Sequence, residues 1–320
     1  MHEEPLIVVV VVHFGSSEMT RACLQSIYDS NYKNLRVIIV DNYPEQRLIH
    51  VFPEVVASVE YIINATNTGY CSGNNVGILK AQEFGAKYIL LLNNDTILDT
   101  AFLSTCVIHM ESQPDIAVIS PKILFHAAPQ YINVAGGQLD INTGEITIFG
   151  LNEKDVGQYD AEREVTFATG CAFFARASVF EQVGVFDEEL FCYGEDVDMS
   201  RRIVLAGLSM KYLPIARVWH KHPMAEHRQY RKNWQFGAMS GMYYLWRNKY
   251  YNQKRYASEN QLKETIKFGY RFVWVLAAYA FKHRRPDLSL AMIFGLFDAI
   301  AGRMGRREYW FLNVARSRTG

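Results

Sequence analysis

LIVVVVV at Leu6–Val12, LRVIIV at Leu35–Val40 and YILLL at Tyr88–Leu92 are three short apolar runs in the first third of the chain. Continuous runs of this length are typical of strands that are buried on both faces of a parallel sheet. Residues with helical composition separate them, at about Met19–Tyr28 and Gly73–Phe84. This alternation predicts an α/β fold, with an open, mostly parallel sheet and helices on both of its faces.

The same alternation continues to about residue 220. Glycine, asparagine and threonine are frequent between Phe125 and Val165, where we expect β-hairpins and loops. The further elements that the pattern predicts are strands at Val59–Ile63, Ile116–Ser120, Thr169–Ala175, Met210–Leu213 and Arg217–Trp219, and helices at Ala101–Gln113, Ala177–Val183 and Glu195–Leu205. Residues 1–225 are therefore expected to form one large α/β domain.

The composition of the 320 residues argues against several classes of protein. Lysine plus arginine and aspartate plus glutamate number 33 each, whereas a nucleic-acid binder usually has a basic excess. The five cysteines are scattered singly without a CxxC pair, which favours reduced thiols in a cytosolic protein over a cysteine-based zinc site. The first apolar run has no basic region before it and no small-residue cleavage site after it, so we expect a strand rather than a signal peptide.

Polar residues follow the apolar runs at the points where the predicted strands end. His13 closes the first run, Asp41 and Asn42 close the second, and Asn93–Asp95 closes the third. In open α/β sheets, ligands bind outside the carboxyl ends of the strands. A carboxylate such as that of Asp95 can bind Mg²⁺ or Mn²⁺ there, together with phosphate oxygens. The alternative is that Asp95 only caps the helix that follows.

Three carboxylates are crowded into four residues at Glu195, Asp196 and Asp198. Acidic residues are favoured at a helix N-terminus by the helix dipole, and that is the structural interpretation. The functional interpretation is a general base that takes the proton of an attacking hydroxyl group. Asp196 and Asp198 cannot both point the same way from a helix, so we expect one of them to be structural.

Two further segments are candidates for ligand binding. His220 follows the predicted strand end Val218-Trp219, and a neutral imidazole is a common metal ligand, although His222 is a rival two residues on. The segment Asn67–Gly77 is rich in glycine and asparagine and leads into a predicted helix, so its backbone can approach a ligand closely. It matches neither a P-loop nor a dinucleotide-binding fingerprint.

Taken in order, these segments resemble the family 2 glycosyltransferases of GT-A fold, in particular their bacterial rhamnosyltransferase-like branch. The resemblance covers Val8 to His220, about two-thirds of the chain. The segments that carry it are the opening strand, turn and helix from Val8, VDN at Val40–Asn42, NTGYCSGNNVGI at Asn67–Ile78, LLNND at Leu91–Asp95 in place of the DxD motif, the acceptor-side segment Gly170–Arg202 that contains the ED motif, and VWH at Val218–His220.

The resemblance implies a GT-A fold, which is Rossmann-like, with a mixed, mostly parallel sheet flanked by helices. It divides residues 1–225 into a nucleotide-sugar half, about 1–121, and an acceptor half, about 122–225. It also implies an inverting transfer from a nucleotide-sugar donor to an acceptor hydroxyl in one in-line displacement. A divalent cation, Mg²⁺ or Mn²⁺, would then offset the charge that develops on the departing nucleoside diphosphate.

The resemblance also assigns roles to individual residues. Asp95 and His220 would hold the metal, Asp196 would be the general base, and Glu195 would orient the acceptor. Asp41 would bind the pyrimidine base, and Asn67 and Gly69 would lie near the base and ribose. The complete set of residues that it implies for nucleotide binding is His13, Phe14, Asp41, Asn67, Gly69, Asn75, Asn93 and Asn94.

The chain departs from the family pattern at two positions in these segments. Asn93 replaces the first acid of the DxD motif, which leaves fewer anionic ligands and leaves the identity of the metal open. Cys171 stands where a small residue is usual. QYRKNW at Gln229–Trp234 does not have the spacing of the QxxRW motif of processive synthases, so we do not expect a polymer synthase.

Residues 226–320 have a different composition, with helical, basic and aromatic stretches. We expect helices at about 226–256, Leu262–Phe281 and Leu288–Ala301, with the basic clusters Lys282–Arg285 and Arg303–Arg307 after the second and third. Apolar faces flanked by basic clusters are typical of helices that lie in an anionic membrane interface. The alternatives are that these helices pack on the catalytic domain or form a homodimer contact.

These expectations together describe a cytoplasmic enzyme, peripheral on the inner face of the cell membrane, that acts on a lipid-linked or oligosaccharide acceptor. L-rhamnose from dTDP-rhamnose is the favoured donor by resemblance, and UDP-hexoses, including UDP-galactofuranose, remain open. Two functions of other classes also remain open at this point. They are a nucleotidyltransferase, which would release pyrophosphate, and a non-catalytic scaffold of glycan assembly.

Overall fold

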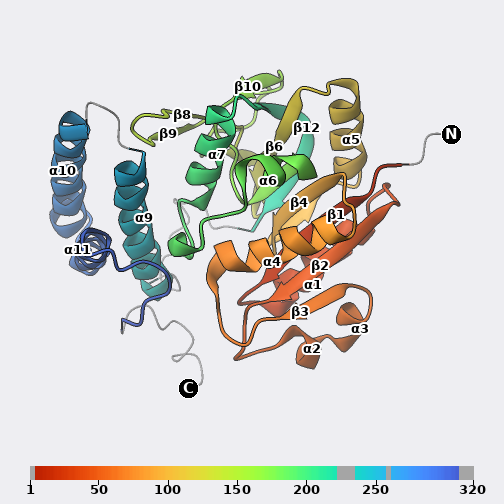
Figure 1. The fold of residues 1–320 in the computed structure, drawn as a ribbon, viewed down its shortest axis with the longest axis horizontal. Coiled ribbons are helices and arrows are strands. Elements are labelled where there is room, and N and C mark those ends of the chain that lie inside the picture. The colour runs from red at the N-terminus through yellow and green to blue at the C-terminus, as the bar shows by residue number, and fades with distance from the viewer. Residues whose placement is uncertain (1–3, 222–234, 257–260, 310–320) are drawn as a thin grey trace. The chain divides into compact units, whose positions relative to one another are not determined.

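The structure is a computed structural model that describes residues 4–221, 235–256 and 261–309 (Figure 1). The chain folds into two compact units. The first, called the sheet unit below, comprises Met1–Leu139, Ile146–Phe186 and Asp196–Met224. The second, called the helical unit, comprises Asp140–Glu145, Asp187–Glu195 and Ala225–Gly320. Each unit is described by itself.

The main sheet of the described residues has its strands in the order β10-β12-β6-β11-β4-β1-β2-β3, with β5 paired to β12 and β7 paired to β6. Its strands are β1 (Ile7–His13), β2 (Leu35–Asp41), β3 (Glu60–Ile63), β4 (Tyr88–Asn93), β5 (Thr96–Leu98), β6 (Ile116–Phe125), β7 (Ala128–Val134), β10 (Arg163–Val165), β11 (Ala172–Arg176) and β12 (Ser209–His220). Strands β3, β2, β1 and β4 are parallel neighbours, whereas β11 is antiparallel to both β4 and β6. The predicted α/β sheet is therefore present, and its antiparallel pairs lie in the second half of the sheet.

Helices cover both faces of this sheet because successive residues of a buried strand point to opposite sides. Val9 and Val11 of β1 share a core with residues of α1 (Ser17–Tyr28) and α5 (Phe102–Ser112). Val10 and Val12 face α4 (Gly69–Glu83) on the other side. A Cβ atom on Gly77 of α4 would lie 2.2 Å from Cγ1 of Val10, so this close approach of helix to strand requires glycine.

The remaining elements of the sheet unit are short. They are α2 (Leu48–Val51), α3 (Pro53–Val56), α6 (Ala177–Val183), α7 (Glu195–Leu205, whose first residue belongs to the helical unit), and the two-stranded sheet of β8 (Gly137–Leu139) and β9 (Ile146–Ile148). Strands β7 to β10 lie in the segment where hairpins and loops are predicted.

One prediction about the strands is wrong. The sequence suggests two short strands at Met210–Leu213 and Arg217–Trp219, but the structure has the single strand β12, Ser209–His220. The register of β12 against β6 shifts between Leu213 and Arg217, and Pro214 lies inside this shift. Proline lacks a backbone N–H, so it interrupts the ladder locally without ending the strand.

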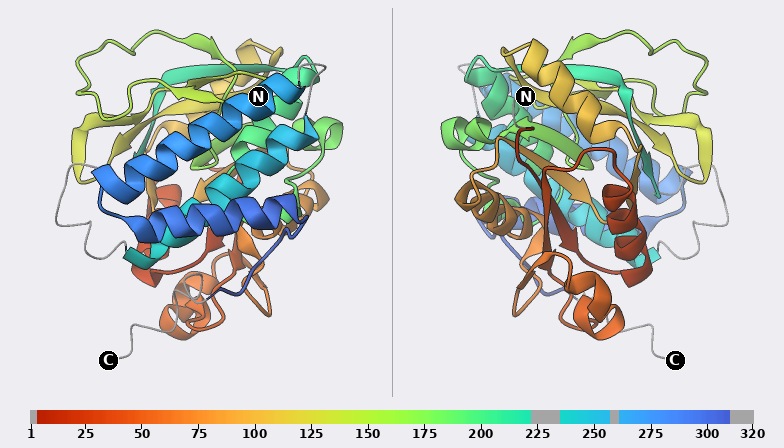
Figure 2. Two further views of the ribbon diagram at one scale, coloured as in Figure 1. Left: turned by 90° about the vertical axis from the view of Figure 1, so that its left-hand side faces the viewer. Right: turned by 90° about the vertical axis from the view of Figure 1, so that its right-hand side faces the viewer.

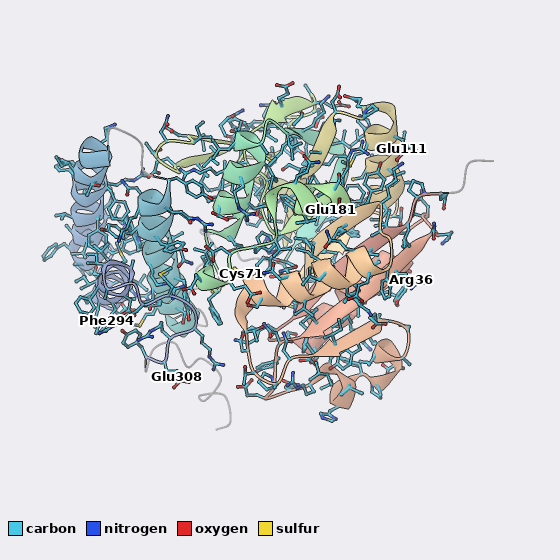
Figure 3. The ribbon with its side chains drawn as sticks, viewed as in Figure 1. Arg36, Cys71, Glu111, Glu181, Phe294 and Glu308 are labelled. Atoms are coloured by element: carbon cyan, nitrogen blue, oxygen red, sulfur yellow. The ribbon has the colours of Figure 1, made fainter. Side chains whose placement is uncertain are left out.

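The helical unit contains α9 (Gln235–Arg255), α10 (Gln261–Ala277), a π-helical turn at Ala278–Lys282 and α11 (Pro286–Ile300) (Figure 2, left). The predicted helices correspond to these elements, but the part of the first between 226 and 234 lies outside the described residues. Trp246 of α9 packs on Phe268 and Phe272 of α10. Phe294 of α11, labelled in Figure 3, packs with Tyr243 and Tyr244 of α9.

None of the helices in the described ranges is both long and apolar enough to cross a bilayer. Helices α10 and α11 each use one side to pack on α9, as the contacts of Phe268, Leu288 and Met292 show. Their opposite sides therefore face away from α9, and these sides carry many of the exposed large apolar residues of the chain.

Candidate functional site

The polar residues predicted at strand ends lie along one edge of the sheet. His13 of β1 is in register with Asp41 of β2, and Val12 is in register with Asn93 of β4. Strands β4 and β6 are both antiparallel to β11, and β12 is parallel to β6, so β12 ends at the same edge. The last residue of β12 is His220.

The chain turns back at this edge and brings Asp95 against His220. After β4, residues Asn94 and Asp95 form a turn, and the short strand β5 then pairs antiparallel with the end of β12. The backbone N–H of Lys221 donates to the carbonyl oxygen of Asp95 at 2.8 Å. The carboxylate Oδ1 of Asp95 lies 3.3 Å from Nε2 of His220.

The His220 ring is held from its other side. Its Nδ1 lies 3.1 Å from Oδ1 of Asn133, a residue of β7. The amide oxygen of Asn133 can only accept, so Nδ1 carries the proton in the neutral ring and the Nε2 lone pair faces Asp95. Metal-binding histidines are commonly fixed by this kind of outer hydrogen bond. Asn133 lies in a segment predicted only as hairpins and loops, so no sequence signal pointed to it.

The carboxylate of Asp95 and the imidazole of His220 are suitable ligands for Mn²⁺ or Mg²⁺. Within residues 4–221, 235–256 and 261–309, no group of three or more His, Cys, Asp or Glu side chains is placed to hold a metal ion. Asp95 and His220 would therefore supply two ligands, leaving the other positions to substrate phosphate oxygens and water, as is usual for Mg²⁺ sites.

Electrostatics around His220 favour a positive charge at this point. Burial lowers the pKa of His220, but the Cys171 sulfur and the Asp95 carboxylate beside the ring raise it well above its usual value. The negative charge of the Asp95 carboxylate also attracts a divalent cation. Because only the neutral ring can bind metal, a cation at this site would take the place of that proton.

Two consecutive residues, Gly170 and Cys171, connect this pair to the predicted general base. The side chain of Cys171 lies beside the ring of His220. The backbone N–H of Gly170 points at Oδ2 of Asp196, at 3.5 Å, and its carbonyl oxygen accepts from the Tyr70 hydroxyl at 2.6 Å. Asp95, His220 and Asp196 are thus gathered around one short stretch of backbone in the sheet unit.

The surroundings of Asp196 make its carboxylate more basic than that of an ordinary aspartate. Burial raises the pKa of Asp196 to about 6, against the opposing effect of the backbone N–H groups of Gly170 and Val197. A carboxylate with a pKa near 6 is still ionised at neutral pH, and it accepts a proton more readily than an ordinary aspartate. Glu195 precedes it at the start of α7 and is buried. Asp198 is buried and pairs with Arg202 at 2.9 Å, so it is the structural acid of the three.

Asp41, predicted to contact the pyrimidine base, organises the turn that follows β2. Its Oδ1 accepts from the backbone N–H of Tyr43 at 3.0 Å and from Arg47 at 3.1 Å. Its Oδ2 accepts from the backbone N–H of Leu48 at 2.9 Å and from the Tyr61 hydroxyl. The carboxylate is fully buried among these groups. The role of Asp41 in base binding stays a prediction, and the contacts point to an action through the shape of this turn.

Asn42 holds the loop that contains Asn67 and Gly69. Its Oδ1 accepts from the backbone N–H and the hydroxyl of Thr68 at 3.1 and 3.0 Å, and from Asn64 at 3.0 Å. Its Nδ2 donates to the carbonyl oxygen of Gly69 at 2.8 Å. The side chain of Asn67 accepts from the backbone N–H of Gly69, whose φ of 86° favours glycine. This loop leads into α4, which contains Cys71 (Figure 3).

The ends of β1 and β4 are joined through Thr20. Its hydroxyl lies 2.8 Å from Nδ1 of His13 and accepts from Nδ2 of Asn94 at 2.9 Å. Asn94 also donates to the carbonyl oxygen of Phe14 at 3.1 Å. Burial lowers the pKa of His13, so its ring is neutral at physiological pH. The exposed ring of Phe14 lies edge to face with Tyr43, with centroids 5.1 Å apart.

Two predicted nucleotide-binding residues show contacts of another kind. The Asn75 side chain exchanges two hydrogen bonds of 2.9 Å with the backbone of Phe186, so these contacts hold the chain after α6. At Asn93 the hydrogen bonds come from the backbone, with its N–H donating to Cys171 at 3.0 Å and its carbonyl accepting from Thr96 at 2.7 Å. The nucleotide-binding roles of Asn75 and Asn93 stay predictions.

Comparison with known proteins adds an independent line of argument. The model of the glycosyltransferase-like family 2 matches residues 4–237, more than half of the chain. The low-salt glycan biosynthesis hexosyltransferase Agl10 of Haloferax volcanii is 23% identical over 308 residues, which are 94% of this chain and 92% of the relative. Rhamnosyltransferase WbbL of Escherichia coli is 24% identical over 224 residues, 67% of this chain and 83% of the relative. Galactofuranosyltransferase GlfT1 of Mycolicibacterium smegmatis is 25% identical over 211 residues, 65% of this chain and 68% of the relative.

Two solved structures share the fold. GalNAc-T7, crystallised with UDP, GalNAc and Mn²⁺, superposes with a TM-score of 0.58 at 15% identity, over 70% of this chain and 45% of its own. S. aureus TarS superposes with a TM-score of 0.54 at 12% identity, over 93% of this chain and 81% of its own. At such identities the likeness shows the fold alone, and it confirms the predicted GT-A class.

Proposed function

The chain belongs to the glycosyltransferase-like family 2, and from this membership and the site geometry we propose a metal-dependent, inverting transfer of a hexose from a nucleotide sugar to a glycan hydroxyl. That it is a glycosyltransferase follows from the family and from relatives named hexosyl-, rhamnosyl- and galactofuranosyltransferases. The roles of individual residues, the sugar and the acceptor are the proposed part.

The observation that carries the proposal is the pairing of Asp95 and His220 at 3.3 Å on the ligand-binding edge of the sheet. A metal ion bound by these two side chains would offset the charge of the departing nucleoside diphosphate. The hydrogen bond from Nδ1 of His220 to the amide oxygen of Asn133 fixes the ring before a ligand arrives. Little reorganisation would then be needed when the donor binds, which favours catalysis.

Asp196 is proposed as the general base. Its carboxylate would take the proton of the acceptor hydroxyl as that oxygen attacks the anomeric carbon from the side opposite the diphosphate. One bond to carbon forms while the bond to the leaving group breaks, so the configuration at that carbon is inverted. The raised pKa of Asp196 supports this role, because it brings the basicity of the carboxylate closer to neutral pH.

L-rhamnose, donated by dTDP-rhamnose, is our first choice of sugar. A relative from Escherichia coli is named a rhamnosyltransferase, and one from Shigella flexneri is named a dTDP-rhamnosyl transferase. A shorter match, 45% identical over 60 residues, is named N-acetylglucosaminyl-diphospho-decaprenol L-rhamnosyltransferase in Mycobacterium tuberculosis. The galactofuranosyltransferase relative supports UDP-galactofuranose as the second choice.

We further propose that the acceptor is lipid-linked and that α10 and α11 lie on the cytoplasmic surface of the cell membrane. The residues on the side of these helices that faces away from α9 are apolar and well exposed, and we call them the outer face. They are Ile266, Tyr270, Val273, Trp274 and Phe281 after the start of α10, and Leu290, Ile293, Phe297 and Ile300 on α11. Trp274 is 66% exposed and Phe281 is 83% exposed. A helix that is apolar on both sides needs a second apolar partner that buries its outer side.

The charge of this region favours an anionic bilayer as that cover. Residues 261–309 contain nine lysines and arginines and four acids, a net charge of +5, although the whole chain is neutral. Tyrosine and tryptophan, both present on the outer face, are enriched where membranes meet water. An apolar face flanked by cations suits a helix lying in the interface plane of an anionic membrane. The alternative is that a second copy of the chain packs on the outer face in a homodimer.

The experiment that tests the proposed reaction is a donor screen. The purified protein would be incubated with Mn²⁺ or Mg²⁺, a lipid-linked acceptor and a panel of nucleotide sugars. The released nucleoside diphosphate is measured with and without a chelator. The proposal expects chelator-sensitive release from one donor, dTDP-rhamnose first. Release that a chelator does not affect would contradict the metal role, and release of pyrophosphate would identify a nucleotidyltransferase.

A further inference from the structure

The segment just before the predicted catalytic acids has an unusual backbone. Phe191, Tyr193 and Gly194 all have positive φ angles, of 63°, 66° and 85°. Aromatic residues rarely adopt this conformation, and it persists only where surrounding contacts enforce it. Gly194 is followed directly by Glu195 and Asp196. The contacts that enforce this backbone therefore act on the residue directly before Glu195.

Those contacts come from α9. Arg247 is fully buried, and its guanidinium donates to the carbonyl oxygens of Glu189 at 3.1 Å and Leu190 at 2.8 Å. A third bond, of 2.5 Å, goes to the carbonyl oxygen of Gly305 in the segment after α11. The N–H of Gly305 in turn donates to the carbonyl oxygen of Glu189 at 2.7 Å. One buried arginine thus joins two separate segments of the helical unit.

Asn248 continues this set of contacts along the segment. Its Nδ2 lies 2.8 Å from the carbonyl oxygen of Leu190, 2.9 Å from that of Cys192 and 2.6 Å from that of Tyr193. One turn further along α9, Nδ2 of Asn252 donates to the carbonyl oxygen of Gly194 at 3.1 Å. Oδ1 of Asn248 accepts from Nε of Arg247 at 2.8 Å, so the first two side chains also hold each other.

The hydrogen bonds from these three side chains to the segment reach its backbone carbonyls. The carbonyls belong to Glu189, Leu190, Cys192, Tyr193 and Gly194. In the described part of the chain no carboxylate pairs with Arg247, and its guanidinium lies over the Tyr244 ring at 4.7 Å. Burying an arginine without a counter-ion is costly unless its donors are used. Here they are used to hold one backbone conformation.

We propose that Arg247, Asn248 and Asn252 are positioning residues for Glu195, and that the helical unit thereby takes part in acceptor recognition. The inference rests on the proposed function, in which Glu195 orients the acceptor. The three side chains lock the backbone up to Gly194, the residue that directly precedes Glu195. The half-exposed Tyr193 ring is held next to it in a strained conformation. The acceptor, a sugar hydroxyl, is the substrate whose alignment depends on this segment.

Asn248→Asp is the sharpest variant, because it changes one group and keeps the shape. The Nδ2 donor becomes an oxygen, so the bonds to Leu190, Cys192 and Tyr193 are lost. Oδ1 remains to accept from Arg247. The matched control is Lys254→Gln on the same helix, where the side chain is exposed. Arg247→Lys is a second variant that keeps the charge and loses the planar fork.

Three quantities are measured on each variant: donor Kd by calorimetry, kcat for transfer to a saturating acceptor, and backbone hydrogen exchange. Misplacement of a reacting group by about 1 Å costs roughly 100-fold in rate, so we expect kcat to fall about 10- to 100-fold for Asn248→Asp. Donor Kd should stay within about twofold of wild type, because the variant is expected to stay folded and the residues proposed to bind the donor are unchanged. Exchange should accelerate at Glu189–Glu195 and not in β1 or β4. Lys254→Gln should match wild type in all three.

The inference is overturned if kcat of Asn248→Asp equals that of wild type. It is also overturned if donor affinity and kcat fall together, which a general loss of folded protein would produce, or if exchange at Glu189–Glu195 is unchanged. If wild type transfers no sugar, the proposed function fails, and the exchange measurement still decides whether α9 holds this segment. Accelerated exchange without any wild-type transfer would overturn the link to acceptor recognition and leave a structural contact.

Discussion

The carboxylate of Asp95 lies 3.3 Å from Nε2 of His220, at the ends of two strands that are not neighbours in the sheet. Strand β5 produces this contact, since its three residues turn back from β4 and pair with the last residues of β12. The contact places a carboxylate and an imidazole together where GT-A folds open to their ligands.

Asp95→Ala should abolish metal-dependent donor binding. Removal of the carboxylate takes away the only anionic side chain proposed to bind the metal. The loss in Mn²⁺ affinity should therefore exceed the roughly 10- to 100-fold that follows loss of an outer hydrogen bond. Calorimetry with dTDP-rhamnose or UDP in the presence and absence of Mn²⁺ measures this. Donor affinity that still depends on Mn²⁺ in the variant would disprove the assignment of Asp95.

Asn133→Leu should weaken metal binding without touching a ligand. Its amide oxygen faces Nδ1 of His220 at 3.1 Å, and an apolar side chain there would leave that ring nitrogen without its partner. We expect Mn²⁺ affinity to fall about 10- to 100-fold. Asn133→Asp is the control, because it keeps an oxygen that accepts from Nδ1. Equal affinities in wild type and Asn133→Leu would show that the outer hydrogen bond has no role.

The fold could be predicted from sequence where the chain is regular. Apolar runs such as Leu6–Val12 and Leu35–Val40 are long and uniform. Predicted helices alternate with them, and few fold architectures are compatible with this alternation. Strand β5 is three residues long and follows the polar Asn94 and Asp95, so no periodic signal marks it. The sequence predicts two short strands at Met210–Leu213 and Arg217–Trp219, but the ladder on either side of Pro214 continues as one strand, β12.

The site residues at strand ends could be predicted from the sequence, whereas most of the residues that hold them in place could not. Asp95 and His220 stand next to apolar runs, and the structure brings them together. Thr20 and Asn133 form hydrogen bonds that hold the site, but each is an ordinary polar residue in its sequence surroundings. The side chain of Asn75 likewise bonds to the backbone of Phe186, 111 residues further along the chain. Partners so distant in sequence leave no local pattern.

Gly77→Ala should destabilise the sheet unit. The added methyl group would lie 2.2 Å from Cγ1 of Val10, so α4 or β1 must shift. Overpacking of this kind costs about 1–3 kcal/mol, which we expect to appear as a lower free energy of unfolding. Gly269→Ala in α10 is the control, because its added methyl group would meet no atom within 4 Å. There the higher helix propensity of alanine should leave stability equal or raised. Denaturant unfolding that ranks the two variants the other way would contradict the packing described for α4.

Trp274→Glu should detach the protein from anionic membranes. The indole ring is 66% exposed on the outer face, and an acid there loses apolar contact and adds repulsion. We expect vesicle partitioning to weaken about 10-fold or more, equivalent to at least about 1.4 kcal/mol. Co-sedimentation with vesicles containing phosphatidylglycerol measures it.

The control for the membrane test is Ile215→Glu, because Ile215 is 58% exposed on β12 of the sheet unit and should be neutral for membrane binding. Undiminished sedimentation of Trp274→Glu would exclude the outer face as the membrane contact. Light scattering on the same samples tests the alternative that a second copy of the chain packs on the outer face. A dimer that dissociates in the variant, without any vesicle binding by wild type, would assign the outer face to a second copy of the chain.

Asp196 is proposed to remove a proton from the acceptor during metal-dependent transfer, and the pH dependence of kcat for wild type and Asp196→Asn reports on this step. The pKa of Asp196 is about 6, and only its ionised form can act as a base. Wild-type kcat should therefore be constant above this pH and fall as the pH drops below about 6. Asp196→Asn should retain donor affinity and lose about 10²- to 10⁴-fold in kcat at pH 8, without this inflection. Wild-type turnover in Asp196→Asn, or the same inflection in both proteins, would contradict the claim.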